Sequence, residues 1–307
     1  MRGPVGDGRG GDSTLPLPVV DLSPSAASGP VTAGIGRAGP DTVIPGRGYP
    51  PGMYRRPVGR ARRHWARRLL RWVLVTAVVV ILLAAVAFGG LMALTPSAGN
   101  AEQLTAAQDQ AHHVAYPGPP VPARFAESLV ATEDHRFYSE PGIDLYAVAR
   151  VGFEYATGHG IQGGATLYQQ LAKLLYTRGQ STAQDEAEQV AMAVKLYMTY
   201  SRPHILQMYA DVVYFGNNLY GLAAASCGYF GVEPADLSWP QAAMLAGLVQ
   251  GPSLDDPLTH PAAARAREVH VVGRLVATGK LTQAQGDAAL AVPLSALVAG
   301  AGQGCSA

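Results

Sequence analysis

The most constraining feature of this sequence is an uncharged, strongly apolar run from Trp72 to Leu94. The run has 23 residues, most of them Val, Leu, Ala or Ile. A helix of this length, rising about 1.5 Å per residue, would cross a hydrocarbon core of roughly 30 Å with a little tilt. The run is longer than the apolar core of a cleaved signal peptide and begins far from the N-terminus. We therefore predict one uncleaved transmembrane helix.

The charges around this run predict its orientation. A cluster of eight arginines between Arg55 and Arg71 precedes it directly, and the next basic side chain after it is Arg124. Because basic residues stay on the cytoplasmic side, we expect a single-pass protein of the cell membrane with a cytoplasmic N-terminus and an extracytoplasmic C-terminal domain. The cluster could instead bind nucleic acid, but beside a membrane span, orientation and contact with anionic lipids explain it better.

The formal net charge of +1 hides two parts of opposite sign. Residues 1–72 carry 12 Arg, no Lys and 4 Asp, a net +8, whereas the remaining 235 residues carry a net −7. A mildly acidic C-terminal part argues against nucleic acid as its partner. The two cysteines, Cys227 and Cys305, exclude a disulfide scaffold and a cysteine-based zinc cluster. We expect Cys227 to be a buried thiol that does not pair with Cys305.

Changes in composition divide the chain into five segments. Gly, Pro and Ser dominate the start, which we expect to be a disordered cytoplasmic tail ending in the basic cluster. A stiff, proline-rich stretch follows the anchor and predicts a linker. The expected boundaries are 1–71 for the tail, 72–95 for the anchor, 96–122 for the linker, 123–291 for a globular domain and 292–307 for a flexible tail.

The globular domain has helical periodicity almost throughout. Apolar residues recur at helical spacing from Leu145 to Phe153 and again from Ala187 to Met198. Ser201 and Ser238, each followed by a proline two residues later, predict helix starts. No segment alternates as a strand, so we predict a mainly α fold. A G-x-G-x-x-G match at 158–163 follows a helix rather than a strand, which excludes a dinucleotide site.

Two groups of polar residues could carry chemistry. Glu133 and Asp134 are adjacent carboxylates at the end of an apolar helix, and a carboxyl in a partly apolar cleft can act as a general acid or base. Further on, Thr166, Gln170 and Lys173 are spaced to form one polar stripe at a helix start, which suits a phosphate or pyrophosphate. Either group alone is better explained as a solvated turn or helix face, but together they favour one polar cleft.

These residues resemble, in order and spacing, the motifs of the peptidoglycan glycosyltransferase domain of family 51. That domain occurs in class A penicillin-binding proteins and in monofunctional transglycosylases. The resemblance covers 123–291 and implies a mainly α, lysozyme-like lobe with a small jaw lobe that dips into the membrane. The matching motifs are Glu133-Asp134-x-x-Phe137 with Gly142-Ile143-Asp144, Gly163 to Gln170, Ser201 to Tyr209, Tyr214-Phe215-Gly216, Tyr229-Phe230-Gly231, and Ala242 to Leu248.

The resemblance also implies an activity. The family joins lipid II, a lipid-linked disaccharide-pentapeptide, into glycan strands with inversion at the anomeric carbon. Glu133 would be the general base that takes the proton of the acceptor sugar hydroxyl, while undecaprenyl pyrophosphate leaves the donor. The positions expected to bind substrate are Asp134, Phe137, Thr166, Gln170, Lys173, Gln189 and Arg202. Neither the Ser-x-x-Lys nor the Lys-Thr-Gly signature of a transpeptidase occurs in the sequence.

The same resemblance sets the expected cofactors and partners. It implies no permanently bound cofactor, although a divalent cation, Mg²⁺ or Mn²⁺, often assists the donor pyrophosphate in this family. The sequence itself shows no metal site. The expected partners are lipid II, the growing glycan strand, the membrane and other cell-wall synthesis proteins, with no nucleic acid among them.

Several positions depart from the family pattern. Aligned without gaps, the Arg-Lys-x-x-Glu motif falls on residues 185–189, where Asp185 and Glu186 replace the two cations and Gln189 replaces the carboxylate. A shift of one residue would supply Glu188 as the carboxylate but would not restore the cations. The histidine of the first motif falls on Glu140, and Tyr168 replaces a threonine of the second. Two hypotheses follow. One is an active transglycosylase with an altered donor site, and the other is a non-enzymatic, membrane-anchored relative that binds lipid II or a cell-wall partner as a scaffold.

Overall fold

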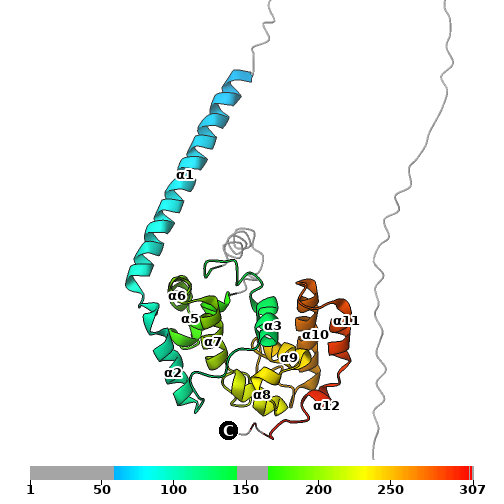
Figure 1. Ribbon diagram of the computed structural model, residues 1–307. Helices are drawn as coiled ribbons and strands as arrows, with labels where there is room; N and C mark the ends of the chain where they lie inside the picture. The colour runs from blue at the N-terminus through cyan, green and yellow to red at the C-terminus, as the bar shows by residue number, and fades with distance from the viewer. Residues whose placement is uncertain (1–58, 144–164, 304, 306–307) are drawn as a thin grey trace, which may run out of the picture. The chain divides into compact units, whose positions relative to one another are not determined.

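The computed structural model describes residues 59–143, 165–303 and 305 (Figure 1). The chain divides into two units, Met1–Arg60 and Ala61–Ala307, and nearly all described elements belong to the second. Within the described ranges the regular elements are helices, with one isolated β-bridge and no strand. The prediction of a mainly α protein is therefore confirmed.

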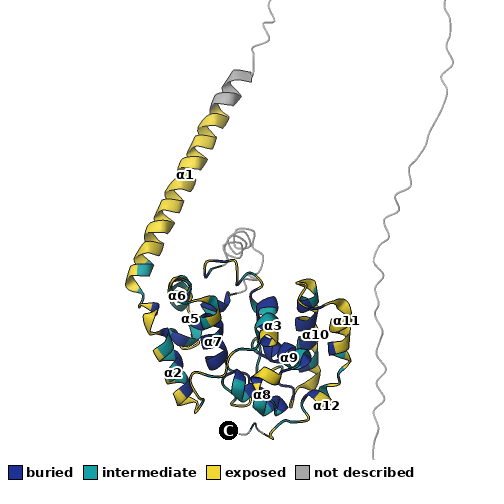
Figure 2. Cartoon of the chain, in the orientation of Figure 1, coloured by how far each residue is buried: buried dark blue, intermediate teal, exposed yellow. Residues whose placement is uncertain are grey.

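Helix α1, Gly59–Leu94, contains the whole apolar run and part of the arginine cluster. From Trp65 onward its side chains are exposed almost throughout (Figure 2), and by length and composition it could cross a membrane. The helix begins before the apolar run because arginine and alanine are also good helix formers. Most of the tail predicted for 1–71 lies outside the described residues.

The rest of the described chain consists of shorter helices joined by turns. In chain order they are η1 (Ala98–Asn100), α2 (Ala101–Ala111), α3 (Ala123–Glu133), α5 (Leu167–Leu175), α6 (Ala183–Thr199), α7 (Arg202–Val212), α8 (Leu222–Phe230), η2 (Pro234–Asp236), α9 (Trp239–Leu248), α10 (Pro261–Ala277), α11 (Gln283–Ala291) and α12 (Leu294–Leu297). Helices α3, α9 and α10 pack on one another, and α5 packs on α6 and α7. Every residue from Ala242 to Leu248 is buried, so α9 is apolar on all sides and lies in the core (Figure 2).

The segment 96–122, expected to be a linker, instead contributes helix α2 to the folded domain. Its buried side chains are Ala101, Thr105 and Asp109, at intervals of one helical turn, and α2 packs on α5 and α7. This is a correction of the sequence-based boundary. The buried face is made of small and polar residues, so a search for large apolar side chains does not detect it.

The predicted helix starts are confirmed. Ser201 is the N-cap of α7, and Ser238 is the N-cap of α9, where its side chain and that of Gln241 form a capping box. Helices α5 and α6 also begin with capping boxes, from Thr166 and Thr182 respectively. At α5, α6 and α9 these local bonds satisfy free N–H groups of the first turn, whereas the Ser201 side chain makes no capping bond and α7 begins there with Pro203 in its first turn.

The C-terminal segment is also part of the fold, contrary to the expectation of a flexible tail over 292–307. Leu297 of α12 is buried, and Cys305 forms a disulfide with Cys227 of α8, with 5.3 Å between their Cα atoms. The expectation that Cys227 is a free thiol is therefore corrected. The two cysteines are 78 residues apart in the sequence, and only the fold brings them together.

Candidate active site

Four of the predicted site residues line one pocket of about 360 Å³. They come from three helices: Glu133 from α3, Gln170 and Lys173 from α5, and Gln189 from α6. Tyr209 of α7 lines the same pocket. The polar cleft expected from two separate sequence motifs is thus present, with a carboxylate and an ammonium group in its wall.

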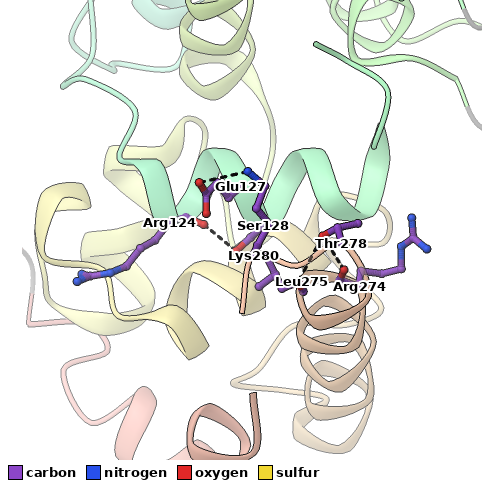
Figure 3. A network of polar contacts seen from close by, with 7 residues as sticks. All are labelled: Arg124, Glu127, Ser128, Arg274, Leu275, Thr278 and Lys280. Atoms are coloured by element: carbon purple, nitrogen blue, oxygen red, sulfur yellow. Dashed lines mark hydrogen bonds and ion pairs between the residues drawn. The ribbon is translucent and has the colours of Figure 1, made fainter. Parts of the chain in front are cut away.

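Contacts between α3 and α10 hold the helix that carries Glu133. Lys280, just beyond α10, pairs with Glu127 of α3 at 3.5 Å, and the Arg274 Nε donates to the carbonyl oxygen of Ala131. Thr278 donates its hydroxyl to the last turn of α10 (Figure 3). The Arg274 bond and the packing of α3 on α9 and α10 therefore hold the end of α3, whereas the partly exposed Lys280–Glu127 pair adds little.

The Glu133 carboxylate lies at the C-terminal end of α3. Its Oε2 accepts a hydrogen bond of 3.0 Å from Gln170 Nε2, and Tyr209 donates its hydroxyl to Gln170 Oε1 at 2.6 Å. Burial raises the pKa of Glu133, against the opposing effects of the Gln170 bond and of Arg267 and His270 on α10. A carboxylate with a raised pKa is a better general base once ionised.

Gln189 and Lys173 form another part of the pocket wall. Gln189 is buried, and its Nε2 donates to Thr177 Oγ1 and to the carbonyl oxygen of Gln180, each at 2.9 Å. Lys173 lies about one turn beyond Gln170 on α5 and is the one cation among the described lining residues. An ammonium group beside a neutral amide can bind an anionic group of a ligand.

Three further predicted residues are absent from the described lining and bond within the protein. Asp134 Oδ2 accepts the N–H of Leu167 at 3.0 Å, and Phe137 stacks on Tyr168 with ring centroids 5.1 Å apart. Thr166 caps α5 and donates its hydroxyl to the carbonyl oxygen of Gly142 at 2.9 Å. The predicted stripe of three residues is therefore corrected to two, Gln170 and Lys173, because an N-cap hydroxyl turns inward to its own helix.

Arg202 lies elsewhere. Its Nε donates to the carbonyl oxygen of Phe137 at 3.2 Å, and its guanidinium carbon is 5.6 Å from the centre of the Tyr197 ring. It lines a separate pocket of about 640 Å³ with Tyr138 and Met198. The structure thus does not bring Arg202 to the pocket of Glu133.

The two carboxylates at the third motif are also absent from the described lining of the pocket. Asp185 Oδ2 accepts hydrogen bonds from the backbone N–H and the hydroxyl of Thr182, at 2.9 and 2.6 Å. These bonds lower the pKa of Asp185 and stabilise the start of α6. Glu186 is exposed, and neither side chain is part of the described lining. The reversed charges therefore disturb the pocket less than the sequence suggests.

Two important residues had no role assigned from the sequence. Tyr209 orients the amide of Gln170, and only its burial beside that amide reveals this role.

Glu140 lies buried next to Asp134. Burial, followed by contact with the Asp134 carboxyl, raises the pKa of Glu140 to about 8. In the sequence, the feature that could have pointed to Glu140 is that it stands where the family pattern has a histidine.

The described residues that line the pocket do not form a binding site for a divalent cation. Mg²⁺ prefers several oxygen ligands, commonly including carboxylates. Among the described lining residues Glu133 supplies the one carboxylate, already bonded to Gln170, and Lys173 is a competing cation. A second group of candidate ligands, Cys227, Glu233 and Cys305, has both sulfur atoms in the disulfide. The described residues at both places therefore do not fit a divalent cation.

Comparisons with known proteins agree with these features. A family profile described as transglycosylase matches residues 100–276, which include α2. Penicillin-binding protein 1A of Aquifex aeolicus is 34% identical over 176 residues, covering 57% of this chain and 24% of that protein. A Cupriavidus necator protein described as a transglycosylase is 32% identical over 174 residues, covering 57% of this chain and 75% of that protein.

Among solved structures, penicillin-binding protein 1A from Haemophilus influenzae aligns with a TM-score of 0.34 and 21% sequence identity. The alignment covers 58% of this chain and 17% of that one. The chain thus spans about a quarter or less of the length of these two penicillin-binding proteins, and three quarters of the Cupriavidus necator protein.

Proposed function

This chain belongs to the transglycosylase family, and from that premise we propose that it is a membrane-anchored peptidoglycan glycosyltransferase that polymerises lipid II into glycan strands. The observation that carries the proposal is the pocket that the partly buried Glu133 carboxylate and Lys173 both line. A general base and a cation in one cleft are what inverting transfer from a pyrophosphate donor requires.

In the proposed reaction, Glu133 takes the proton from the acceptor sugar hydroxyl as that oxygen forms a bond to the anomeric carbon of the donor. The bond from that carbon to the pyrophosphate oxygen breaks, and its electron pair leaves with the pyrophosphate. Gln170 holds Glu133 Oε2, so Oε1 is the oxygen without a hydrogen bond from the described residues. Lys173 would stabilise the negative charge of the leaving pyrophosphate.

The proposed location is the cell membrane, with α1 as the anchor and the folded domain outside the cytoplasm. Helix α1 is long and apolar enough to span a bilayer, and the arginines precede its apolar part. The Cys227–Cys305 disulfide supports this orientation, because disulfides persist in oxidising compartments and are rare in the cytosol.

One observation favours the scaffold alternative. The resemblance puts the second carboxylate of the family at Gln189, and this side chain lies in the pocket with its amide bonded to Thr177 and Gln180. A neutral amide cannot act as a base or carry the charge of that carboxylate. A protein that binds lipid II without polymerising it would keep the pocket and tolerate this change.

Polymerisation of labelled lipid II by the full chain in detergent tests the proposal. Glu133→Gln should lower the rate by a factor on the order of 10²–10⁴, because an amide cannot accept the proton. Glu127→Gln is the matched control, since it removes a carboxylate from the same helix outside the pocket. Lipid II binding without polymerisation by the parent chain would support the scaffold. Polymerisation that survives Glu133→Gln would exclude Glu133 as the base.

A further inference from the structure

Glu140 is a buried carboxyl group in the turn that follows α3. It is 6% exposed, and neither of its oxygens has a hydrogen-bond donor among the described residues. Its backbone N–H is bonded to the carbonyl oxygen of Arg136, so the turn itself is ordered around it. An ionised carboxylate buried without a donor would be strongly destabilising. The group must therefore carry a proton or share one.

The neighbour that can share this proton is Asp134. The Asp134 carboxyl is also buried, at 7% exposure, and lies near enough to Glu140 to raise its pKa. Its Oδ2 already accepts the N–H of Leu167, the first residue of α5. Two carboxyl groups in contact cannot both be ionised without strong repulsion, so one proton lies between them.

The other groups that face this pair do not remove the need for that proton. Arg136 in the same turn lowers the pKa of Glu140, but burial and Asp134 raise it by more. On α5, the Tyr168 hydroxyl is buried, has no hydrogen-bond partner among the described residues and interacts with both carboxyls. From α7, Arg202 acts on Tyr168. Glu140 and Tyr168 both depart from the family pattern, and the fold brings them to the same place.

We propose that Glu140 is a positioning residue whose protonated carboxyl donates a hydrogen bond to Asp134 and thereby holds the first turn of α5. Glu140 is linked to the pocket through Asp134 and helix α5. Asp134 bonds the first N–H of α5, and the same helix carries Gln170 to Glu133 and Lys173 into the pocket. The effect on catalysis rests on the proposed function of the pocket, whereas the shared proton does not.

The proposal has a definite pH dependence. The folded-state pKa of Glu140 is raised above its ordinary value of 4.5, so its contribution to stability is complete below about pH 4.5. That contribution falls as the pH rises through the raised pKa, because the proton must then go to solvent. Deprotonation leaves two anions in contact at the start of α5, which should loosen the Asp134 bond to Leu167.

Two variants of the full chain in detergent separate the roles of the proton and the hydrogen bond. Glu140→Gln keeps the size and a donor but cannot ionise, and Glu140→Leu removes the donor. Between pH 5 and 8 the folding equilibrium constant of the parent should fall relative to that of Glu140→Gln by up to about tenfold per pH unit. Glu127→Gln, a carboxyl on α3 away from this pair, is the control and should follow the parent.

Amide hydrogen exchange at a fixed pH of about 6 measures the positioning directly. Protection of the first turn of α5 should match the parent in Glu140→Gln and fall at least about tenfold in Glu140→Leu. If the parent polymerises lipid II, Glu140→Gln should keep its neutral-pH rate and retain activity at a higher pH than the parent does.

Equal pH dependence of stability in the parent and Glu140→Gln would overturn the proposal, as would unchanged α5 protection in Glu140→Leu. If Glu140→Leu does not fold, the comparison of the parent with Glu140→Gln decides alone. If both physical results appear but the parent has no activity, the proposed function fails while the shared proton and its positioning role stand.

Discussion

Replacing Gln189 with Glu restores the carboxylate that the family resemblance predicts, and the structure gives the cost of doing so. The Gln189 side chain is 8% exposed, and its Nε2 donates to Thr177 Oγ1 and to the carbonyl oxygen of Gln180. In Gln189→Glu the hydroxyl of Thr177 can turn and donate to the new carboxylate. The carbonyl of Gln180 cannot, so one hydrogen bond is lost and two acceptors face each other.

The magnitude follows from these contacts. A lost hydrogen bond is worth about 1 kcal/mol, and an unsatisfied buried acceptor adds about 1–3 kcal/mol. We therefore expect Gln189→Glu to lower the free energy of unfolding by about 2–4 kcal/mol at neutral pH. For a folded part of this size, that corresponds to a fall in Tm of about 5–15 °C.

Thermal and urea unfolding at about pH 8 and pH 5 measure the effect. Burial should raise the folded-state pKa of the carboxyl introduced at position 189, so its contribution to stability is greatest at low pH and is lost as the pH rises. The deficit should therefore be smaller at the lower pH, where a protonated carboxyl can donate to the Gln180 carbonyl. Glu188→Gln, at the adjacent position, is the control and should change the stability by less than about 0.5 kcal/mol.

Equal stability of Gln189→Glu and the parent at both pH values would refute this reasoning, and so would a larger deficit at the lower pH. The same variant also separates the two proposed functions. If the missing carboxylate is what limits activity, polymerisation per folded molecule should rise despite the lower stability. If the pocket only binds lipid II, binding should persist with no gain in polymerisation.

Three further predictions concern other parts of the chain. Asp185→Ala should lower the urea concentration at the midpoint of unfolding, because the capping box of α6 is lost, and an unchanged midpoint would contradict this role. Burial, followed by the charge of Asp211, raises the pKa of Asp109 from 3.8 to about 7, so its contribution to stability is complete below about pH 4 and is lost as the pH rises through about 7. Asp109→Asn should therefore gain stability relative to the parent as the pH rises from about 4 to about 7, and a constant difference in unfolding free energy over this range would argue against the raised pKa. A cysteine at the exposed Ser97 should react with an impermeant thiol reagent on intact cells, whereas one at Ser25 should not; the opposite pattern would reverse the proposed orientation.

Features that depend on neighbouring residues could be predicted from the sequence. The apolar run of α1 is visible in composition alone. The helix starts at Ser201 and Ser238 depend on residues within one helical turn: a proline in each first turn, and at Ser238 also a capping box. The mainly α fold follows from helical periodicity, which is also a local property. Glu133 and Gln170 could be proposed as site residues because their motifs have specific composition and spacing.

Contacts between distant segments required the tertiary structure. The burial of α2, the Cys227–Cys305 disulfide and the contact of Gln170 with Glu133 join residues far apart in the sequence. The direction of a side chain is likewise decided by its partners: Asp185 turns to its own helix cap, although its position in the motif suggests a ligand contact. Glu140 is a further example. Its protonation depends on burial and on the Asp134 carboxyl, and both effects arise only when the chain is folded.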